Sequence, residues 1–149
     1  MLSQNSQQRH AVEYRSATTG DLDLLAVWNK QLIEDSGHDN PMSVAELRER
    51  MAGWLAGEYR GILFIIAGAP VAYAVYKERD DHLYLRQFFV DRAQRRKGIG
   101  TEAMALLGKA IFPSGKRVQI EVMAWNKPGS AFWKSAGFHP RYLGMELAT

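Results

Sequence analysis

Three consecutive strand-like segments in the middle of the chain most constrain its fold. They run from Gly61 to Ala67, Val71 to Arg79 and His82 to Val90, and each is rich in Ile, Val, Tyr or Phe. Only a Gly-Ala-Pro turn and an Asp-Asp turn separate them. Such residues bounded by such turns are typical of strands. The pattern predicts an antiparallel meander.

The segment before the meander predicts one short strand and two helices. Val12 to Ala17 has strand character, and the capping residues that follow it introduce apolar residues at helical spacing. We expect this first helix to end near Gly37. The sequence Ser43-Val-Ala-Glu46 has the form of a capping box and predicts the start of the second helix.

The segment after the meander predicts helix, strand, helix and strand. Apolar spacing indicates a helix over Thr101 to Phe112, followed by a strand over Arg117 to Ala124, which implies a parallel crossover. A short helix over Gly129 to Ser135 and a final strand over Tyr142 to Leu147 complete the order β-α-α-β-β-β-α-β-α-β. The expected fold class is α+β, with a mixed, largely antiparallel sheet flanked by helices.

Length and composition exclude several classes of protein. The 149 residues suit one domain, with residues 1 to 11 as a flexible tail. The lack of cysteine excludes disulfide scaffolds and thiolate chemistry, and the four histidines show no metal-ligand spacing, so we expect no metal. The uncharged stretch from Gly61 to Tyr76 is too short for a membrane span. The polar first residues show no signal peptide, which predicts a cytoplasmic protein without a membrane partner.

The loop from Asp91 to Thr101 carries the strongest functional signal. It places two glycines two residues apart next to four cations within six residues, and a predicted helix follows. Glycines allow backbone N–H groups to turn inward, and a helix N-terminus attracts anions. The pattern indicates a phosphate site, and the alternative is a solvated basic turn.

Two other functions fit part of this loop. Gly98 to Ala103 matches the dinucleotide pattern Gly-x-Gly-x-x-Ala, with Glu121 as the ribose-binding acid. However, Gly98 follows Val90 by eight residues, whereas that motif begins directly after its strand. The cations also suit a nucleic-acid partner, which we rank low because a phosphate group already accounts for them.

The loop sequence Arg95-Arg96-Lys97-Gly98-Ile99-Gly100 resembles the acetyl-coenzyme A loop of the GNAT superfamily of N-acetyltransferases, Gln/Arg-x-x-Gly-x-Gly/Ala. A second stretch, from Asn126 through Ala131 to Phe138, resembles that family's Asn…Ala…Tyr-x-x-x-Gly-Phe signature. The predicted order of elements also resembles the family's topology over nearly the whole chain.

The resemblance implies that acetyl-coenzyme A is the co-substrate. The amides of Arg96 to Thr101 would bind its pyrophosphate, and Phe89 and Val90 would pair with the pantetheine arm like an added strand, with a backbone N–H near Val90 polarising the thioester. Asn126 would bond the pantetheine or neighbouring backbone. The implied cofactor-binding residues are Phe89, Val90, Arg95, Arg96, Lys97, Gly98, Ile99, Gly100, Thr101, Asn126, Ser130, Phe132 and Trp133.

The resemblance also implies catalytic roles. Glu121 lies in Glu-Val-Met-Ala-Trp-Asn, which is similar to the run of N-terminal acetyltransferases whose Glu acts as the base; the alternative is a structural carboxylate. Trp133 stands where the family usually has a Tyr that protonates the coenzyme thiolate. Either the thiolate therefore leaves unprotonated, or another hydroxyl, such as that of Tyr84 or Tyr142, acts as the acid. Tyr84 also stands where histone-acetylating members carry Glu, which argues against their mechanism.

The expected reaction is direct acetyl transfer to a primary amine of a small molecule or peptide in a ternary complex. Glu34, Asp35, His38 and Asp39 are candidates for attracting a cationic amine, and a solvated helix end is the alternative. An acyl-coenzyme A binding module with little catalysis is the alternative function, suggested by Trp133. A homodimer is also compatible with the sequence.

Overall fold

The computed structural model describes residues 9–149, and its centre is a five-stranded sheet of order β1-β2-β3-β4-β5. The predicted meander is confirmed as β2 (Arg60–Ile66), β3 (Ala69–Glu78) and β4 (His82–Val90). The first strand, β1 (Glu13–Ser16), pairs antiparallel with β2, and the last, β5 (Arg117–Gln119), pairs parallel with β4. The fold class is therefore the expected α+β class with a mixed, largely antiparallel sheet.

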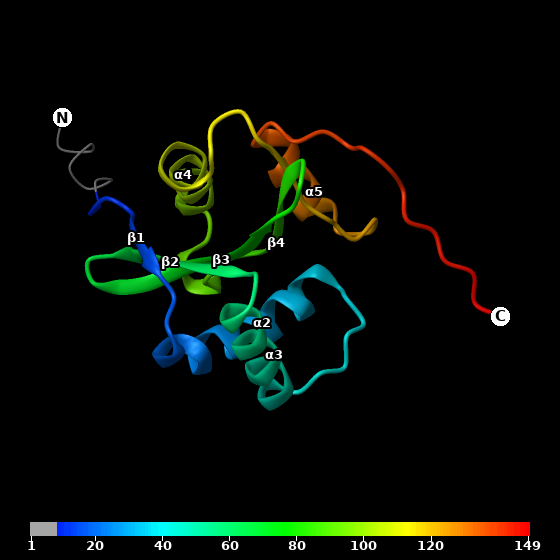
Figure 1. Cartoon of the computed structure of the whole chain (residues 1–149), viewed down its shortest axis with the longest axis horizontal. Helices are drawn as coiled ribbons and strands as arrows, with labels where there is room; N and C mark the ends of the chain where they lie inside the picture. The colour runs from blue at the N-terminus through cyan, green and yellow to red at the C-terminus, as the bar shows by residue number, and fades with distance from the viewer. Residues whose placement is uncertain (1–8) are drawn as a thin grey trace.

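Helices cover both faces of this sheet (Figure 1). On one face lie α2 (Leu22–Ser36), which follows the short 3-10 helix η1 (Thr19–Asp21), and α3 (Val44–Ala56). On the other face lies α4 (Ile99–Leu106), which continues as the π-helical turn η3 (Leu107–Ile111). The remaining helix, α5 (Lys127–Ser135), packs beside the C-terminal end of β4. No helix within residues 9–149 is long and apolar enough to span a membrane.

Each face of the sheet has its own apolar core. On the α4 face, Phe64, Leu83, Ile99 and Leu107 are completely or almost completely buried. On the α2–α3 face, Trp28 stacks on Tyr73 at 6.2 Å with an interplanar angle of 8°. Two buried faces explain why the middle strands read as nearly continuous apolar runs.

The predicted helix boundaries follow from local chemistry. Ser43 and Glu46 form the expected capping box, because the Glu46 N–H donates to Ser43 Oγ at 3.2 Å and the Ser43 N–H donates to Glu46 Oε1 at 2.9 Å. Gly37 ends α2 in the left-handed conformation, with φ of 71°. These two boundaries lie where the sequence predicts them.

Two predicted strands differ from the structure. The strand expected over Arg117 to Ala124 pairs only as far as Gln119, because β4 and β5 separate there. The final strand expected over Tyr142 to Leu147 does not form, and the segment runs away from the sheet (Figure 1). Its apolar side chains are 67 to 89% exposed at Tyr142, Leu143, Met145 and Leu147. Strand propensity alone does not make a strand where no neighbouring strand pairs with it.

The flexible tail expected over residues 1 to 11 falls mostly on residues 1–8, which lie outside the described residues. Of the remainder, Arg9 donates a hydrogen bond to the Lys97 carbonyl at 3.2 Å and forms an ion pair with Glu102. The beginning of the described chain therefore lies against the start of α4.

Candidate active site

The loop between β4 and α4 folds into a concave set of backbone donors. After a 3-10 turn, η2 (Arg92–Gln94), Arg96 and Gly98 adopt left-handed conformations with φ of 64° and 78°. Alternating conformations of this kind turn successive N–H groups toward one point. The N–H groups of residues 98–101 donate to no acceptor within residues 9–149, as expected at the start of a helix. This arrangement fits an anionic group such as a pyrophosphate.

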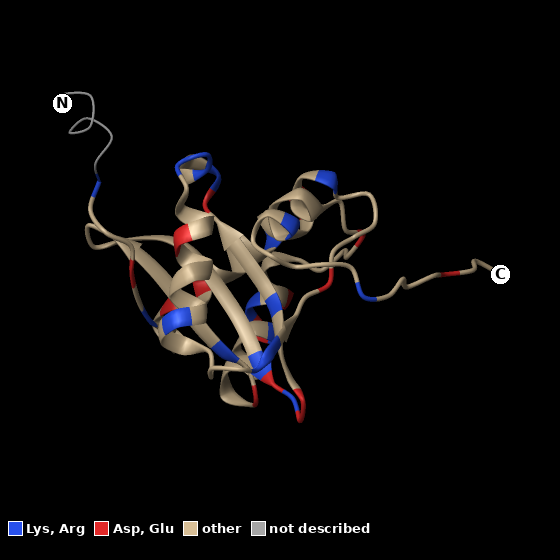
Figure 2. Cartoon of the chain, turned by 90° about the horizontal axis from the view of Figure 1, so that it is seen from above, with Lys and Arg blue, Asp and Glu red and all other residues tan. Residues whose placement is uncertain are grey.

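Figure 2 shows Lys and Arg gathered on this loop, above the start of α4. Two of these cations are already paired within the chain. Arg92 contacts Asp35 and Glu34 at 2.7 and 3.1 Å, and Arg95 contacts Asp35 at 2.7 Å. Partial burial alone would raise the pKa of Asp35, but hydrogen bonds from Arg92 and Arg95 outweigh it and hold that pKa below its ordinary value.

These ion pairs revise two expectations. The acidic group at the end of α2 is not free to attract a cationic amine, because Glu34 and Asp35 are bound by the loop arginines. Arg95 also donates to the Val90 carbonyl at 2.9 Å, so its side chain fastens the loop to β4. Among the cations of this loop, Arg96 and Lys97 form no ion pair within residues 9–149, so their side chains are free to meet a phosphate.

A gap between β4 and β5 lies next to the loop. The two strands pair only over His82 to Tyr84, so the rest of β4, through Phe89 and Val90, pairs with β3 alone. The pairing of β3 with β4 contains a β-bulge at Arg86, because Val75 pairs with Gln87 whereas Tyr76 pairs with Leu85. β-Bulges are frequent next to active sites, where they redirect side chains. The gap leaves a free sheet edge of the kind an extended ligand occupies.

Tyr84 and Glu121 meet at this gap. The Tyr84 hydroxyl donates a hydrogen bond of 2.6 Å to Glu121 Oε1. Burial, together with that hydrogen bond to the carboxylate, raises the pKa of Tyr84 above its ordinary value. Both residues line a cavity of about 400 Å³, which Arg79, His82, Arg86 and Tyr142 also border. The structure thus brings together the two residues that sequence analysis selected as catalytic.

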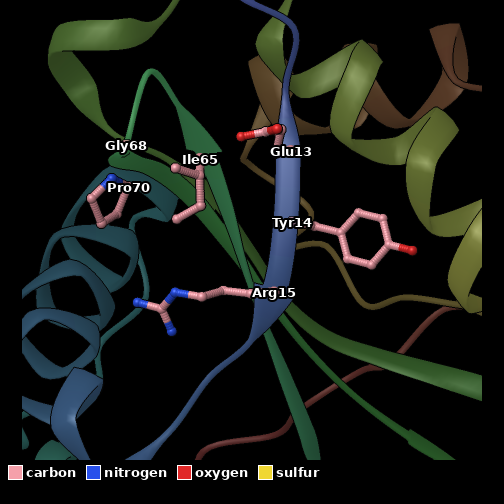
Figure 3. Close-up of a pocket in the computed structure, with 6 residues that line it drawn as sticks. All are labelled: Glu13, Tyr14, Arg15, Ile65, Gly68 and Pro70. Carbon is pink, nitrogen blue, oxygen red and sulfur yellow. The ribbon is translucent and has the colours of Figure 1, made fainter.

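A second hollow, of about 490 Å³, lies at the opposite edge of the sheet. Figure 3 shows Glu13 and Arg15 on one side of β1 and Tyr14 on the other, beside the turn at Gly68 and Pro70. Its lining includes neither the loop between β4 and α4 nor the Tyr84–Glu121 pair. The smaller cavity is therefore the candidate active site.

The second motif forms α5, which packs against the loop. Asn126 caps this helix by accepting a hydrogen bond of 3.0 Å from the Gly129 N–H, so its carboxamide contacts neighbouring backbone. A Cβ on Gly100 would lie 3.1 Å from the Phe132 ring, so that glycine permits close packing of α4 and α5. Phe132 stacks on Phe88 at 6.0 Å, and the half-buried Ser130 lies in the first turn of α5.

Trp133 lies within an aromatic cluster. Its ring is 5.5 Å from Phe88, 4.9 Å from Phe132 and 5.2 Å from Phe138. These edge-to-face contacts explain the large aromatic residue by packing alone.

Sequence analysis missed two arginines that border the cavity and a third that shares an aromatic contact with one of them. Arg79 and Arg86 border the cavity, and Arg50 and Arg86 both contact Trp54, with the Arg50 guanidinium 4.3 Å from that ring's centre. They stand on three different elements or turns, so no local motif links them. Only the tertiary structure brings them together.

The comparisons with known proteins agree with this geometry. The model of the acetyltransferase (GNAT) family matches residues 23–138. A possible acetyltransferase from Clostridium difficile 630 has a similar structure, with a TM-score of 0.75, 19% identity, and coverage of 94% of this chain and 98% of that one. No curated protein matches the sequence.

Two further similar structures contain the coenzyme. Aminoglycoside N-acetyltransferase AAC(6')-Iy in complex with CoA gives a TM-score of 0.75 at 12% identity, with 95% of this chain and 96% of that chain covered. A predicted acetyltransferase with acetyl-CoA from Clostridium acetobutylicum gives 0.69 at 19% identity, with 92% and 96% covered. At these identities the likeness shows the fold.

Proposed function

Because the chain belongs to the acetyltransferase (GNAT) family, we propose that it transfers the acetyl group of acetyl-coenzyme A directly to a primary amine in a ternary complex. The observation that carries this proposal is the Tyr84–Glu121 hydrogen bond at the gap between β4 and β5. A carboxylate held there has access to a small cavity on one side and a free strand edge on the other.

The loop residues fit the phosphates of coenzyme A. The N–H groups of residues 98–101 supply donors, the α4 N-terminus supplies partial positive charge, and Arg96 and Lys97 supply full charges. The unpaired edge of β4 at Phe89 and Val90 supplies main-chain partners for the pantetheine arm.

Glu121 acts as the base in this proposal. Its Oε1 accepts a hydrogen bond from the Tyr84 hydroxyl, which orients the carboxylate. Oε2 is then available to take a proton from the substrate ammonium. The freed amine lone pair attacks the thioester carbonyl, the C–N bond forms, and the C–S bond then breaks. The nitrogen then loses its second proton to the departing thiolate or to water, which leaves the neutral amide. The chain has no cysteine to carry the acetyl group, which supports direct transfer.

The leaving thiolate needs no acid from Trp133. A coenzyme thiol has a pKa near ~8.5, so its thiolate is a tolerable leaving group at neutral pH. Tyr84 is a weak acid because its pKa is raised, and its proton is engaged by Glu121. This favours a positioning role for Tyr84 over the role of general acid.

The first test is thermal unfolding with acetyl-coenzyme A, coenzyme A or NAD(H). At about 100 times the dissociation constant, a ligand of the native state adds about 2.7 kcal/mol, which raises Tm by several degrees for a domain of this size. We expect a shift with both coenzyme A forms and none with NAD(H). If neither coenzyme A form raises Tm, the transferase proposal is wrong.

The second test is Glu121→Gln, assayed by thiol release. Loss of the base should lower kcat by about 10²- to 10⁴-fold while the Tm shift with acetyl-coenzyme A persists. Glu49→Gln, which removes an exposed carboxylate on α3, is the matched control and should leave kcat unchanged. An unchanged kcat in Glu121→Gln would remove Glu121 from catalysis, and no thiol release with any amine would leave a coenzyme-binding module.

A further inference from the structure

The cavity beside Tyr84 and Glu121 is lined by more positive than negative side chains. Arg79 and Arg86 border it, whereas Glu121 is the one carboxylate among its lining residues within the described chain. His82, which also lines it, contacts Asp81 at 2.7 Å. A cavity that binds a polycationic amine would be expected to have more carboxylates than arginines in its lining, since like charges repel.

The cavity arginines contact aromatic rings instead of carboxylates. The Arg79 guanidinium lies 5.0 Å from the centre of the Tyr84 ring, and that of Arg86 lies 4.5 Å from the centre of the Trp54 ring. Arg86 also donates to the Tyr59 hydroxyl at 3.3 Å. Neither arginine forms an ion pair with a carboxylate in residues 9–149, so their charges are oriented but not neutralised.

The arginines elsewhere on the surface behave differently. Most of them pair with a carboxylate within the chain, namely Arg9, Arg15, Arg48, Arg92, Arg95 and Arg117. The acidic residues at the end of α2 are among these partners. The two acidic residues at the end of α2 are therefore engaged by the loop arginines, whereas the cavity arginines have no carboxylate partner within the described chain.

Arg50 is a third cation, with its guanidinium 4.3 Å from the centre of the Trp54 ring. Its Nη2 donates to Asn29 Oδ1 at 3.3 Å, and its buried Nε has no partner within the described chain. Burial lowers the pKa of Arg50, and repulsion from Arg86 lowers it further. Two guanidinium groups thus contact one indole, and neither has a carboxylate partner within the described chain.

We propose, on the basis of the transferase function proposed above, that the acceptor is an amine that also carries a carboxylate, bound by Arg79 and Arg86 while its amino group meets Glu121. The planar guanidinium fork matches a carboxylate in two parallel hydrogen bonds, and its aromatic contacts hold it in place. A cavity of about 400 Å³ suits a small molecule of this kind.

The test compares matched acceptors. Thiol release is measured with a series of ω-amino acids, with the corresponding carboxamides, and with aminoalkyl phosphates of equal length. We expect the amino acids to have a kcat/KM about 10-fold or more above that of their carboxamides, because a hydrogen bond between two charged groups is stronger than one to a neutral amide. Phosphates that react as well as the amino acids would overturn the assignment of the anion to a carboxylate, because a guanidinium fork also matches phosphate.

Variants locate the effect. Arg86→Gln and, separately, Arg79→Gln should raise KM for the amino acids by about 10-fold and leave KM for the carboxamides unchanged. Two variants are used because Arg86 also packs on Trp54, whereas Arg79 lies at the turn after β3. The control Arg60→Gln removes an exposed charge on β2 that does not line the cavity. It should change neither KM for the amino acids nor KM for the carboxamides.

Binding gives a readout that does not need chemistry. Calorimetry with the preferred amino acid, in the presence of coenzyme A, should show binding that weakens in Arg86→Gln. Equal rates with acids and carboxamides would overturn the carboxylate inference and leave acetyl transfer intact. Binding of the acid without thiol release from any amine would support the anion site and overturn the transferase; the absence of both would overturn both proposals.

Discussion

A single glycine, Gly98, determines the backbone conformation of the loop between β4 and α4, which we propose binds the phosphates of coenzyme A. Gly98 has φ of 78°, and a Cβ there would meet no atom within 4 Å, so conformation and not space requires glycine. Gly68, in the turn between β2 and β3, has φ of 82° and is equally uncrowded. Both positions require a left-handed backbone conformation, but only Gly98 lies in the candidate site.

This pair gives a matched experiment. Gly98→Ala and Gly68→Ala should each cost about 1 kcal/mol of unfolding free energy, because an L-residue is strained in the left-handed region. Only Gly98→Ala should also weaken acetyl-coenzyme A binding, since it turns the loop N–H groups away from one another. Urea unfolding and calorimetry check the two effects, and an equal loss of affinity in both variants would exclude a specific role for the loop.

At the scale of elements, Asp21 fixes the start of the α2 layer. Its carboxylate accepts hydrogen bonds of 2.8 and 2.9 Å from Arg15 on β1 and one of 2.8 Å from the Thr18 N–H. The Arg15 hydrogen bonds are the main reason that the pKa of Asp21 falls from 3.8 to about 2. The same side chain thus links a strand to the first turn of a helix.

Asp21 should make stability depend on pH. A lowered pKa means that the ionised carboxylate stabilises the fold above about pH 4 and that this contribution disappears as pH falls toward 2. Because Arg15 is half exposed, solvent reduces the effect to about 1 kcal/mol. We expect the free energy of unfolding of the wild type, measured with urea at pH 6, to exceed that of Asp21→Asn by about 1 kcal/mol. This difference should vanish near pH 2.

The control for this comparison is Asp39→Asn, whose side chain is 99% exposed. It removes the same charge and should show almost no difference from wild type at either pH. A difference between wild type and Asp21→Asn that stayed constant from pH 6 to pH 2 would show that Asp21 acts by its shape and not by its charge.

At the scale of the whole molecule, a continuous sheet ends at a gap. β2, β3 and β4 share two cores, whereas the chain after Gln119 has no strand partner and the segment 139–149 is exposed. Local stability follows such differences in burial and pairing. The acetyl-coenzyme A site proposed above lies at the boundary between the two regions.

Amide hydrogen exchange should show this division. Amides of β3 should exchange slowest, and those of residues 120–126 and 139–149 fastest. Acetyl-coenzyme A should slow exchange at residues 98–101, whose N–H groups are unpaired within the described chain. Slow exchange over residues 142–147 in the free protein would show instead that this segment pairs as the strand that the sequence predicts.

The sequence by itself determined the elements that depend on local chemistry. Turn residues defined the meander, Ser43 and Glu46 defined a helix start, and the glycines of the loop indicated a phosphate site beside a helix. Each of these signals acts within a few residues, so a linear pattern records it. The fold class followed from their order.

Tertiary structure alone decided which charges stay available and where the sheet ends. Arg92 and Arg95 look like phosphate ligands in the sequence, but they pair with Asp35, about 60 residues away. Arg79 and Arg86 carry no motif, yet they border the cavity of Glu121. Ion pairs and strand pairing depend on distances in space between remote segments, which local propensity does not encode. For the same reason the segment at Tyr142 has strand composition and no strand.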